Sequence, residues 1–121
     1  MNYKEVLEEG SKNLKNKKIK NPNLESELIL SKVVNKSREQ IILNINSHIN
    51  QKHINIFKNY LSRRDKKEPM AYILGYKYFW KYKFLVDNSV LIPRPDTEVI
   101  IEESLKLIKT NKSKKILDIG T

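Results

Sequence analysis

A proline-bounded corner at residues 91–98, Leu-Ile-Pro-Arg-Pro-Asp-Thr-Glu, restricts the fold of this chain more than any other stretch. Each proline ring fixes its own φ at about −65° and removes a backbone amide donor. Each ring also disfavours the α region for the residue before it, so Ile92 and Arg94 are expected to be extended. The Arg94 side chain should therefore project from a nearly fixed point of the backbone.

A helix is expected directly after this corner and up to about residue 109. Pro95 suits the first helical turn, and the next three residues are capping or acidic types that favour a helix start: Asp96, Thr97 and Glu98. An apolar stripe at helical spacing follows, formed by Val99, Ile100, Leu105 and Ile108. On these residues alone, a purely structural strand-to-helix corner explains the stretch as well as a functional one.

The first 75 residues are expected to form a small bundle of about five short amphipathic helices. Apolar residues recur at helical spacing in the segments 2–17, 24–34, 37–43, 51–64 and 70–74. Ser37 with Gln40 is a capping-box pattern, and Gly75 is expected to cap the last helix. Gly10 is expected to weaken the first helix, because glycine has a low helix propensity.

Residues 76–92 are expected to form a β-hairpin that links the bundle to the C-terminal part of the chain. Side chains alternate at strand spacing, with many aromatic residues, from Tyr76 to Val86. Asp87-Asn88-Ser89 is a turn signal, and residues 90–92 can form the return strand. Beyond a loop at 110–113, residues 114–119 are expected to form a further strand that ends at Gly120.

The composition limits the classes of protein and of site. The chain has no cysteine, which excludes disulfides and thiolate metal sites. His48 and His53 have no second pair of ligand residues nearby and are interpreted as surface residues, so no metal site is expected. No apolar run approaches membrane-spanning length, and the N-terminus lacks the apolar core of a signal peptide. A soluble, cytoplasmic protein is therefore expected.

The formal net charge of +10 suits an acidic protein partner, a nucleic acid or a membrane surface. Lysine far outnumbers arginine, and asparagine and isoleucine are abundant. The coding bias of an AT-rich genome explains this excess of lysine better than a dedicated nucleic-acid footprint, which usually gathers both cations on one face. Specific binding of nucleic acid or of a membrane is therefore not expected.

Four motifs in a fixed order carry a resemblance to a known family. The chain contains, in order, residues 68–75 (EPMAYILG), Phe79-Trp80, the corner at 91–98 (LIPRPDTE) and residues 118–121 (DIGT). This set resembles the release-factor glutamine methyltransferase family, of the HemK or PrmC type, which reads EPxAYxxG, FW, LIPRPDTE and DxGTGSG. The resemblance covers the whole chain, closely from Glu68 onward, and corresponds to the N-terminal portion of such an enzyme.

The resemblance implies a mainly α chain in three parts. Residues 1–75 would be a helical substrate-recognition bundle, residues 76–92 a β-hairpin linker, and residues 93–121 the start of a Rossmann-like methyltransferase domain. The family transfers a methyl group from S-adenosylmethionine to the side-chain nitrogen of the glutamine in the Gly-Gly-Gln motif of peptide-chain release factors. A release factor is accordingly the expected partner.

The resemblance also implies a cofactor role for Asp118, Gly120 and Thr121, which match the first half of the family's cofactor loop. Gly120 would let the backbone approach S-adenosylmethionine, because glycine has no Cβ and tolerates unusual φ values. Asp118 would orient this loop or meet the amino group of the ligand. The structural alternative is a strand end that merely finishes in small residues.

Arg94, Phe79 and Trp80 are the expected substrate contacts. The planar guanidinium of Arg94 offers a fork of donors, and the two aromatic side chains could line the substrate cleft. The structural alternative for Arg94 is an ion pair with Asp96 or Glu98. For Phe79 and Trp80 it is packing within the hairpin, which is the favoured interpretation because aromatic side chains on a strand pack first.

The family's Asn-Pro-Pro-Tyr motif, which aims the weakly nucleophilic amide nitrogen, does not occur in the sequence. Because positioning carries most of such catalysis, this chain alone is expected to be inactive. Two other functions remain open. The chain could be the N-terminal part of a nucleic-acid adenine N6-methyltransferase, or a non-enzymatic protein-interaction module.

Overall fold

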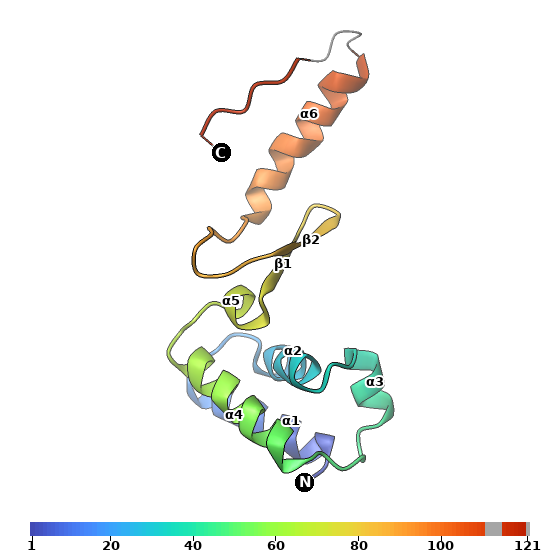
Figure 1. Ribbon diagram of the computed structural model, residues 1–121, viewed down its shortest axis with the longest axis vertical. Coiled ribbons are helices and arrows are strands. Elements are labelled where there is room, and N and C mark those ends of the chain that lie inside the picture. Colours follow the sequence, from blue (N-terminus) through green and yellow to red (C-terminus); the bar gives the residue numbers. More distant parts are fainter. Residues whose placement is uncertain (111–114, 121) are drawn as a thin grey trace.

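The computed structural model describes residues 1–110 and 115–120. Its elements are helices α1 (Tyr3–Asn16), α2 (Pro22–Val34), α3 (Arg38–Leu43), α4 (Gln51–Asp65) and α5 (Met70–Leu74), strands β1 (Tyr76–Phe79) and β2 (Tyr82–Leu85), a 3₁₀ helix (Pro95–Thr97) and helix α6 (Glu98–Thr110). Helices α1 to α5 lie together at one end, the hairpin lies in the middle, and α6 extends away from the bundle (Figure 1). The predicted mainly α chain, with a five-helix bundle followed by a hairpin, is confirmed.

Side-chain caps fix where the bundle helices begin and end. At the start of α1, the Asn2 side chain accepts a hydrogen bond from the Glu5 N–H, and the Glu5 carboxylate accepts one from the Asn2 N–H, both at 2.9 Å. Ser37 and Gln40 form the predicted capping box before α3. Gly75 caps α5 with a φ of 83°, as predicted. These contacts satisfy backbone groups that a helix end leaves without partners.

The core lies where α1, α2 and α4 meet. Its largest side chains, each less than 2% exposed, are Phe57, Leu14, Ile29, Leu30, Ile41, Ile73, Val6 and Ser26. Gly10 is buried among them, and a Cβ at this position would lie 2.5 Å from Ser26 Oγ and 2.7 Å from Phe57 Cζ. The low helix propensity of Gly10 therefore does not interrupt α1, and its missing side chain lets α1 approach α2 and α4 closely.

Two arginines at the end of α4 fix the chain as it enters α5. Arg63 binds both carboxylate oxygens of Glu68, at 2.8 and 2.6 Å. Arg64 binds both carboxylate oxygens of Glu25 in α2, at 2.7 and 3.1 Å, and donates to the backbone carbonyl of Glu68 at 3.0 Å. Such bidentate pairs restrain orientation as well as distance, so the EPMAYILG segment starts from a fixed point on the bundle.

The Arg63–Glu68 pair gives the stability of the bundle a dependence on pH. The hydrogen bond from Arg63 lowers the pKa of Glu68, so the pair stabilises the fold above the ordinary glutamate pKa of about 4.3, and this contribution is lost as pH falls through the lowered value. We expect Glu68→Gln to cost about 0.2–1 kcal/mol at pH 7, because both groups are partly exposed. In urea unfolding at pH 7, 5, 4 and 3, the difference from wild type should shrink toward the acid end. A difference that stays constant with pH, or one that survives in an Arg63→Gln background, would contradict this assignment.

The hairpin turns earlier than predicted. Strands β1 and β2 pair antiparallel with Phe79 opposite Tyr82, so the turn falls at Trp80-Lys81 and not at residues 87–89. The Asp87-Asn88-Ser89 turn exists, with the Asp87 carboxylate accepting the Ser89 N–H at 2.8 Å, but residues 90–92 form no strand. The prediction of the return strand is therefore wrong. Alternation with a period of two continues across both strands and does not reveal where the chain reverses.

Helix α6 confirms the helix predicted after the corner, and it includes Thr110, which was expected in the following loop. Residues 115–120 lie in no helix or strand, so the predicted strand is wrong over 115–119, while residues 111–114 lie outside the described part. A strand needs a neighbour for its backbone hydrogen bonds, and the strands of the described chain, β1 and β2, pair with each other. Across residues 1–110 and 115–120, no helix is long and apolar enough to span a membrane.

Candidate functional site

The proline-bounded corner holds Arg94 as predicted. Its backbone is extended, with φ −95° and ψ 137°, and Pro95 opens the 3₁₀ helix that leads into α6. The Arg94 side chain is exposed, and within the described residues it forms no ion pair with Asp96 or Glu98. The structural alternative considered for this arginine is thus not observed, and its guanidinium faces solvent.

Glu98 joins the corner to the turn of the hairpin. Its carboxylate accepts a hydrogen bond of 2.7 Å from the backbone N–H of Trp80. Trp80 has a φ of 56°, a left-handed conformation that few residues other than glycine adopt. The contact satisfies an amide that the tight turn leaves without a partner in the strand ladder. The structure therefore brings together two motifs of the sequence, Phe79-Trp80 and the corner, across 18 residues of chain.

The side chains of Phe79 and Trp80 are half-buried and make hairpin contacts. The ring of Phe79 meets that of Phe84 edge to face, with centroids 6.1 Å apart. The ammonium of Lys81 lies 5.6 Å from the centre of the Trp80 ring. These contacts fit packing within the hairpin, and the half-exposed surface that remains is what a substrate could reach.

The residues expected to bind the cofactor are not brought to this corner by any contact among the described residues. Asp118 and Gly120 are exposed, and Thr121 lies outside the described part. Gly120 has a φ of 82°, with no other group within 4 Å of where a Cβ would lie. This positive φ and the open space fit a glycine turn that a ligand approaches closely, so these two residues are compatible with part of a cofactor loop.

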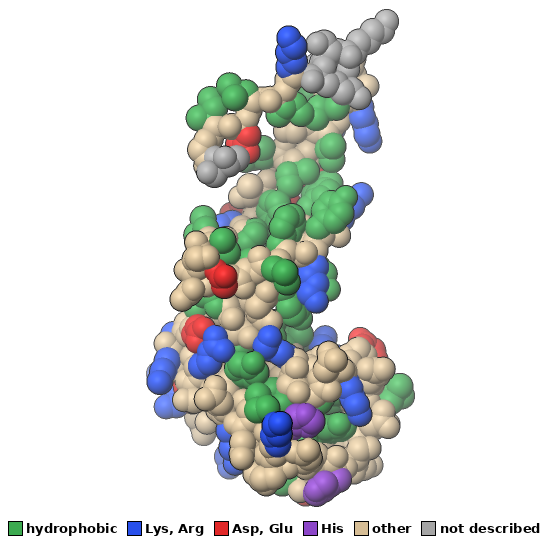
Figure 2. All heavy atoms as spheres, in the orientation of Figure 1, with side chains coloured by type: hydrophobic (Ala, Val, Ile, Leu, Met, Phe, Trp, Pro, Cys, Tyr) green, Lys and Arg blue, Asp and Glu red, His purple; other side chains and the backbone are tan. Residues whose placement is uncertain are grey.

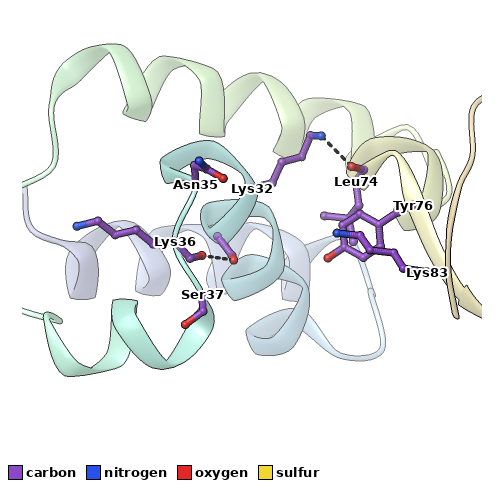
Figure 3. A pocket seen from close by; sticks show the side chains of 8 residues that line it. Lys32, Asn35, Lys36, Ser37, Leu74, Tyr76 and Lys83 are labelled. Carbon is purple, nitrogen blue, oxygen red and sulfur yellow. Dashed lines mark hydrogen bonds between the residues drawn. The ribbon is translucent and has the colours of Figure 1, made fainter. Parts of the chain in front are cut away.

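A second candidate site, which the sequence analysis did not predict, lies where the hairpin meets the bundle. A cavity of about 450 Å³ opens between the C-terminal end of α2, the last residue of α5 and the hairpin, and we call it the basic pocket. Figure 3 shows its lining: Lys32, Asn35, Lys36, Ser37, Leu74, Tyr76 and Lys83, with Ser31. A clue in the sequence is the pair of lysines near the end of a predicted helix, but only tertiary packing places Lys32 on the same side as Lys83, while the Lys36 ammonium points away from both (Figure 3).

An apolar pocket of about 270 Å³ adjoins the basic pocket. Leu74 and Tyr76 line both cavities, and the remaining lining of the apolar pocket is Leu28, Met70, Ala71, Lys77 and Tyr78. We call the two pockets together the junction surface. Figure 2 shows lysine side chains beside hydrophobic ones over this middle part of the molecule.

The residues of these sites are of types that can bind a ligand. Within the described residues, no three His, Asp or Glu side chains lie close enough together to hold a metal ion. His48 is exposed and His53 partly exposed, on the bundle. The arrangement thus offers a solvent-facing arginine beside two aromatic side chains, and a cationic surface beside an apolar pocket.

The sequence of this chain is similar to those of proteins named as methyltransferases. The "Release factor glutamine methyltransferase" of Buchnera aphidicola subsp. Baizongia pistaciae is 40% identical over 121 residues, covering all of this chain and 43% of the relative. The protein of the same name from Coxiella burnetii is 40% identical over 102 residues, 84% of this chain and 37% of the relative. A "Bifunctional methyltransferase" of Rickettsia felis is 40% identical over 99 residues, 82% of this chain and 19% of the relative.

The family is defined by a match over the bundle. Residues 5–75 match the family model described as the PrmC N-terminal domain. The chain therefore belongs to the PrmC family, as its motifs predicted. It spans less than half the length of these relatives.

Proposed function

We propose that this chain is the substrate-docking part of a protein-glutamine methyltransferase that modifies the Gly-Gly-Gln glutamine of peptide-chain release factors in the cytoplasm. The observation that carries the proposal is the similarity, over the entire chain, to a relative named release factor glutamine methyltransferase. Residues 1–75 dock the release factor, residues 76–92 link, and residues 93–121 open the methyltransferase domain. Specific binding of nucleic acid is not part of this function.

The corner supplies the groups nearest the acceptor glutamine. Arg94 offers donors to the substrate from a rigid backbone, and Phe79 and Trp80 provide an apolar wall. Glu98 is a positioning residue, because its hydrogen bond to the Trp80 N–H holds the turn that carries both aromatic side chains. S-adenosylmethionine supplies the methyl group when bound, and Asp118, Gly120 and Thr121 would hold part of it.

The chain by itself should bind without catalysing. An amide nitrogen is a weak nucleophile and has to be aimed at the methyl carbon with water excluded. The Asn-Pro-Pro-Tyr motif that does so in the family is absent from the sequence. The exposed positions of Asp118 and Gly120 also offer no enclosed cofactor site.

Calorimetric titration with a purified release factor tests the docking role. We expect the 121-residue chain to bind the release factor with a dissociation constant in the micromolar range, roughly −8 kcal/mol. In a parallel assay, labelled S-adenosylmethionine should transfer no methyl group to the release factor above a blank without protein. Absence of binding would refute the docking role, and methylation above the blank would refute the inactivity of this chain.

A further inference from the structure

The ammonium groups of the lysines that line the basic pocket contact neutral groups. Lys32 Nζ donates to the Leu74 carbonyl at 2.8 Å and lies 5.8 Å from the centre of the Tyr60 ring. Lys83 Nζ lies 4.1 Å from the centre of the Tyr76 ring. A cation over an aromatic face is held in place but keeps its full charge. These contacts therefore fix the ammonium groups without neutralising them.

Lys36 also contacts a neutral side chain, but its ammonium points away from Lys83 and Tyr76 (Figure 3). Its Nζ lies 5.6 Å from the centre of the Tyr3 ring and donates to the Tyr3 hydroxyl at 3.4 Å. Each ammonium carries three donors, and one hydrogen bond to a neutral oxygen leaves the others available. All three lysines are exposed, so an incoming anion can reach them without rearrangement of the bundle.

Four other cations of the bundle are paired with carboxylates. Carboxylates neutralise Arg38, Arg63, Arg64 and Lys58, through Glu27, Glu68, Glu25 and Glu9. No acidic side chain lines either pocket of the junction surface, whereas four lysines do. The junction surface therefore carries a positive potential that no carboxylate of its lining offsets, and this potential favours encounter with an acidic surface.

The apolar pocket indicates which class of partner fits. Leu28, Met70 and Ala71 offer an aliphatic wall that a leucine, methionine or phenylalanine side chain could fill. A nucleic acid has no aliphatic side chain to place there. No arginine, whose planar fork suits phosphate, lines either pocket. An acidic protein segment can bind both the basic pocket and the apolar pocket, whereas a nucleic acid can bind only the basic one.

We propose that the junction surface binds a short acidic segment of the protein partner, with carboxylates at Lys32 and Lys83 and one apolar side chain in the adjoining pocket. This inference rests on the proposed function, since it takes the release factor as the partner. The inference specifies the surface on which the release factor docks and the acidic and apolar character of the segment that docks there. Docking here leaves Trp80, at the turn of the hairpin, and Arg94, beyond the hairpin, free for the acceptor glutamine.

Charge reversal tests the basic half of the surface. Binding of the release factor to Lys32→Glu/Lys83→Glu should be about tenfold weaker or more than to wild type, the loss being largest at low salt and smaller at about 300 mM. The matched control Lys12→Glu/Lys52→Glu reverses two exposed lysines on α1 and α4 and should change binding by less than about twofold. Unchanged circular dichroism and melting temperature would show that both variants fold.

Two tyrosines of one hairpin test the apolar half. Tyr78 lines the apolar pocket and is 64% exposed, whereas Tyr82 is 66% exposed and lines neither pocket. Tyr78→Ala should weaken release-factor binding by about threefold to tenfold, and Tyr82→Ala should not. Equal effects of the two substitutions would overturn the assignment of the apolar pocket.

The outcomes separate this inference from the proposed function. If wild-type chain binds the release factor and the lysine variants and their control bind equally well, the inference is wrong and the docking role stands. If wild-type chain does not bind at all, the docking role fails and the inference fails with it. If the wild-type chain binds single-stranded RNA, and the junction variants lose RNA binding but keep release-factor binding, the junction surface binds nucleic acid and the inference is overturned.

Discussion

Replacing Gly10 with valine is expected to lower the free energy of unfolding of the bundle by about 3 kcal/mol or more. The first atom of any side chain would lie 2.5 Å from Ser26 Oγ and 2.7 Å from Phe57 Cζ. Neither neighbour can yield easily. Ser26 is fully buried and donates to the Leu7 carbonyl at 3.2 Å, and Phe57 is 1% exposed. Accommodating valine therefore requires α1 to move away from both helices.

The sign of the smaller change Gly10→Ala distinguishes packing from helix propensity. In an exposed helix, alanine is favoured over glycine by about 1 kcal/mol, so propensity alone predicts a more stable protein. We expect a less stable one, because the steric cost exceeds this gain. Urea unfolding followed at 222 nm measures both variants, and Lys12→Val on the exposed side of α1 controls for the β-branched side chain. Stabilisation by Gly10→Ala would show that α1 does not pack so closely.

The bundle could be predicted from the sequence because its signals are local. Apolar spacing and caps place the helices, and the observed bounds of α1 (Tyr3–Asn16) and α4 (Gln51–Asp65) lie within one residue of those expected. The Ser37 capping box and the left-handed Gly75 depend on residues within four positions of each other. Such features follow from backbone hydrogen bonding near a helix end, which the sequence itself specifies.

The hairpin and Gly10 show where local reasoning fails. The turn at Trp80-Lys81 contains none of the glycine or asparagine residues that usually mark a two-residue turn. It is supported by Glu98, which is 18 positions away along the chain. Gly10 likewise has its role because Ser26 and Phe57 converge on it from two other helices. In both cases a tertiary contact overrides the local preference.

The two candidate sites also differ in how far local sequence signals predict them. The corner motif predicted the extended backbone of Arg94, since two prolines act on their own neighbours. The roles of Arg94, Phe79, Trp80, Asp118, Gly120 and Thr121 came from resemblance and stay predictions. The junction surface could not be predicted, because it depends on contacts between distant residues. Lys32 donates to the Leu74 carbonyl across 42 residues, and Lys83 lies at the pocket because the hairpin packs there.

Truncating Leu30 to alanine is expected to cost about 3–5 kcal/mol of unfolding free energy, a range that includes both the lost transfer of the side chain from water and the cavity left behind. Leu30 is fully buried in α2, and it belongs to the one hydrophobic cluster that includes residues of α1, α3, α4 and α5. A domain of this size has a total stability of the same order, about 5–15 kcal/mol. The variant should therefore show a much lower urea midpoint and melting temperature.

The same substitution at Leu43 isolates the effect of burial. Leu43 is also helical but is 83% exposed, so Leu43→Ala removes identical atoms with little change in contacts and should alter stability by less than about 0.5 kcal/mol. The difference between the two variants measures what the centre of the bundle contributes, independent of helix propensity. Equal and small losses would mean that Leu30 does not lie at the centre of the packed core. A large loss at Leu30 alone would show that the bundle depends on the packing of α2, the helix that carries Lys32 of the basic pocket.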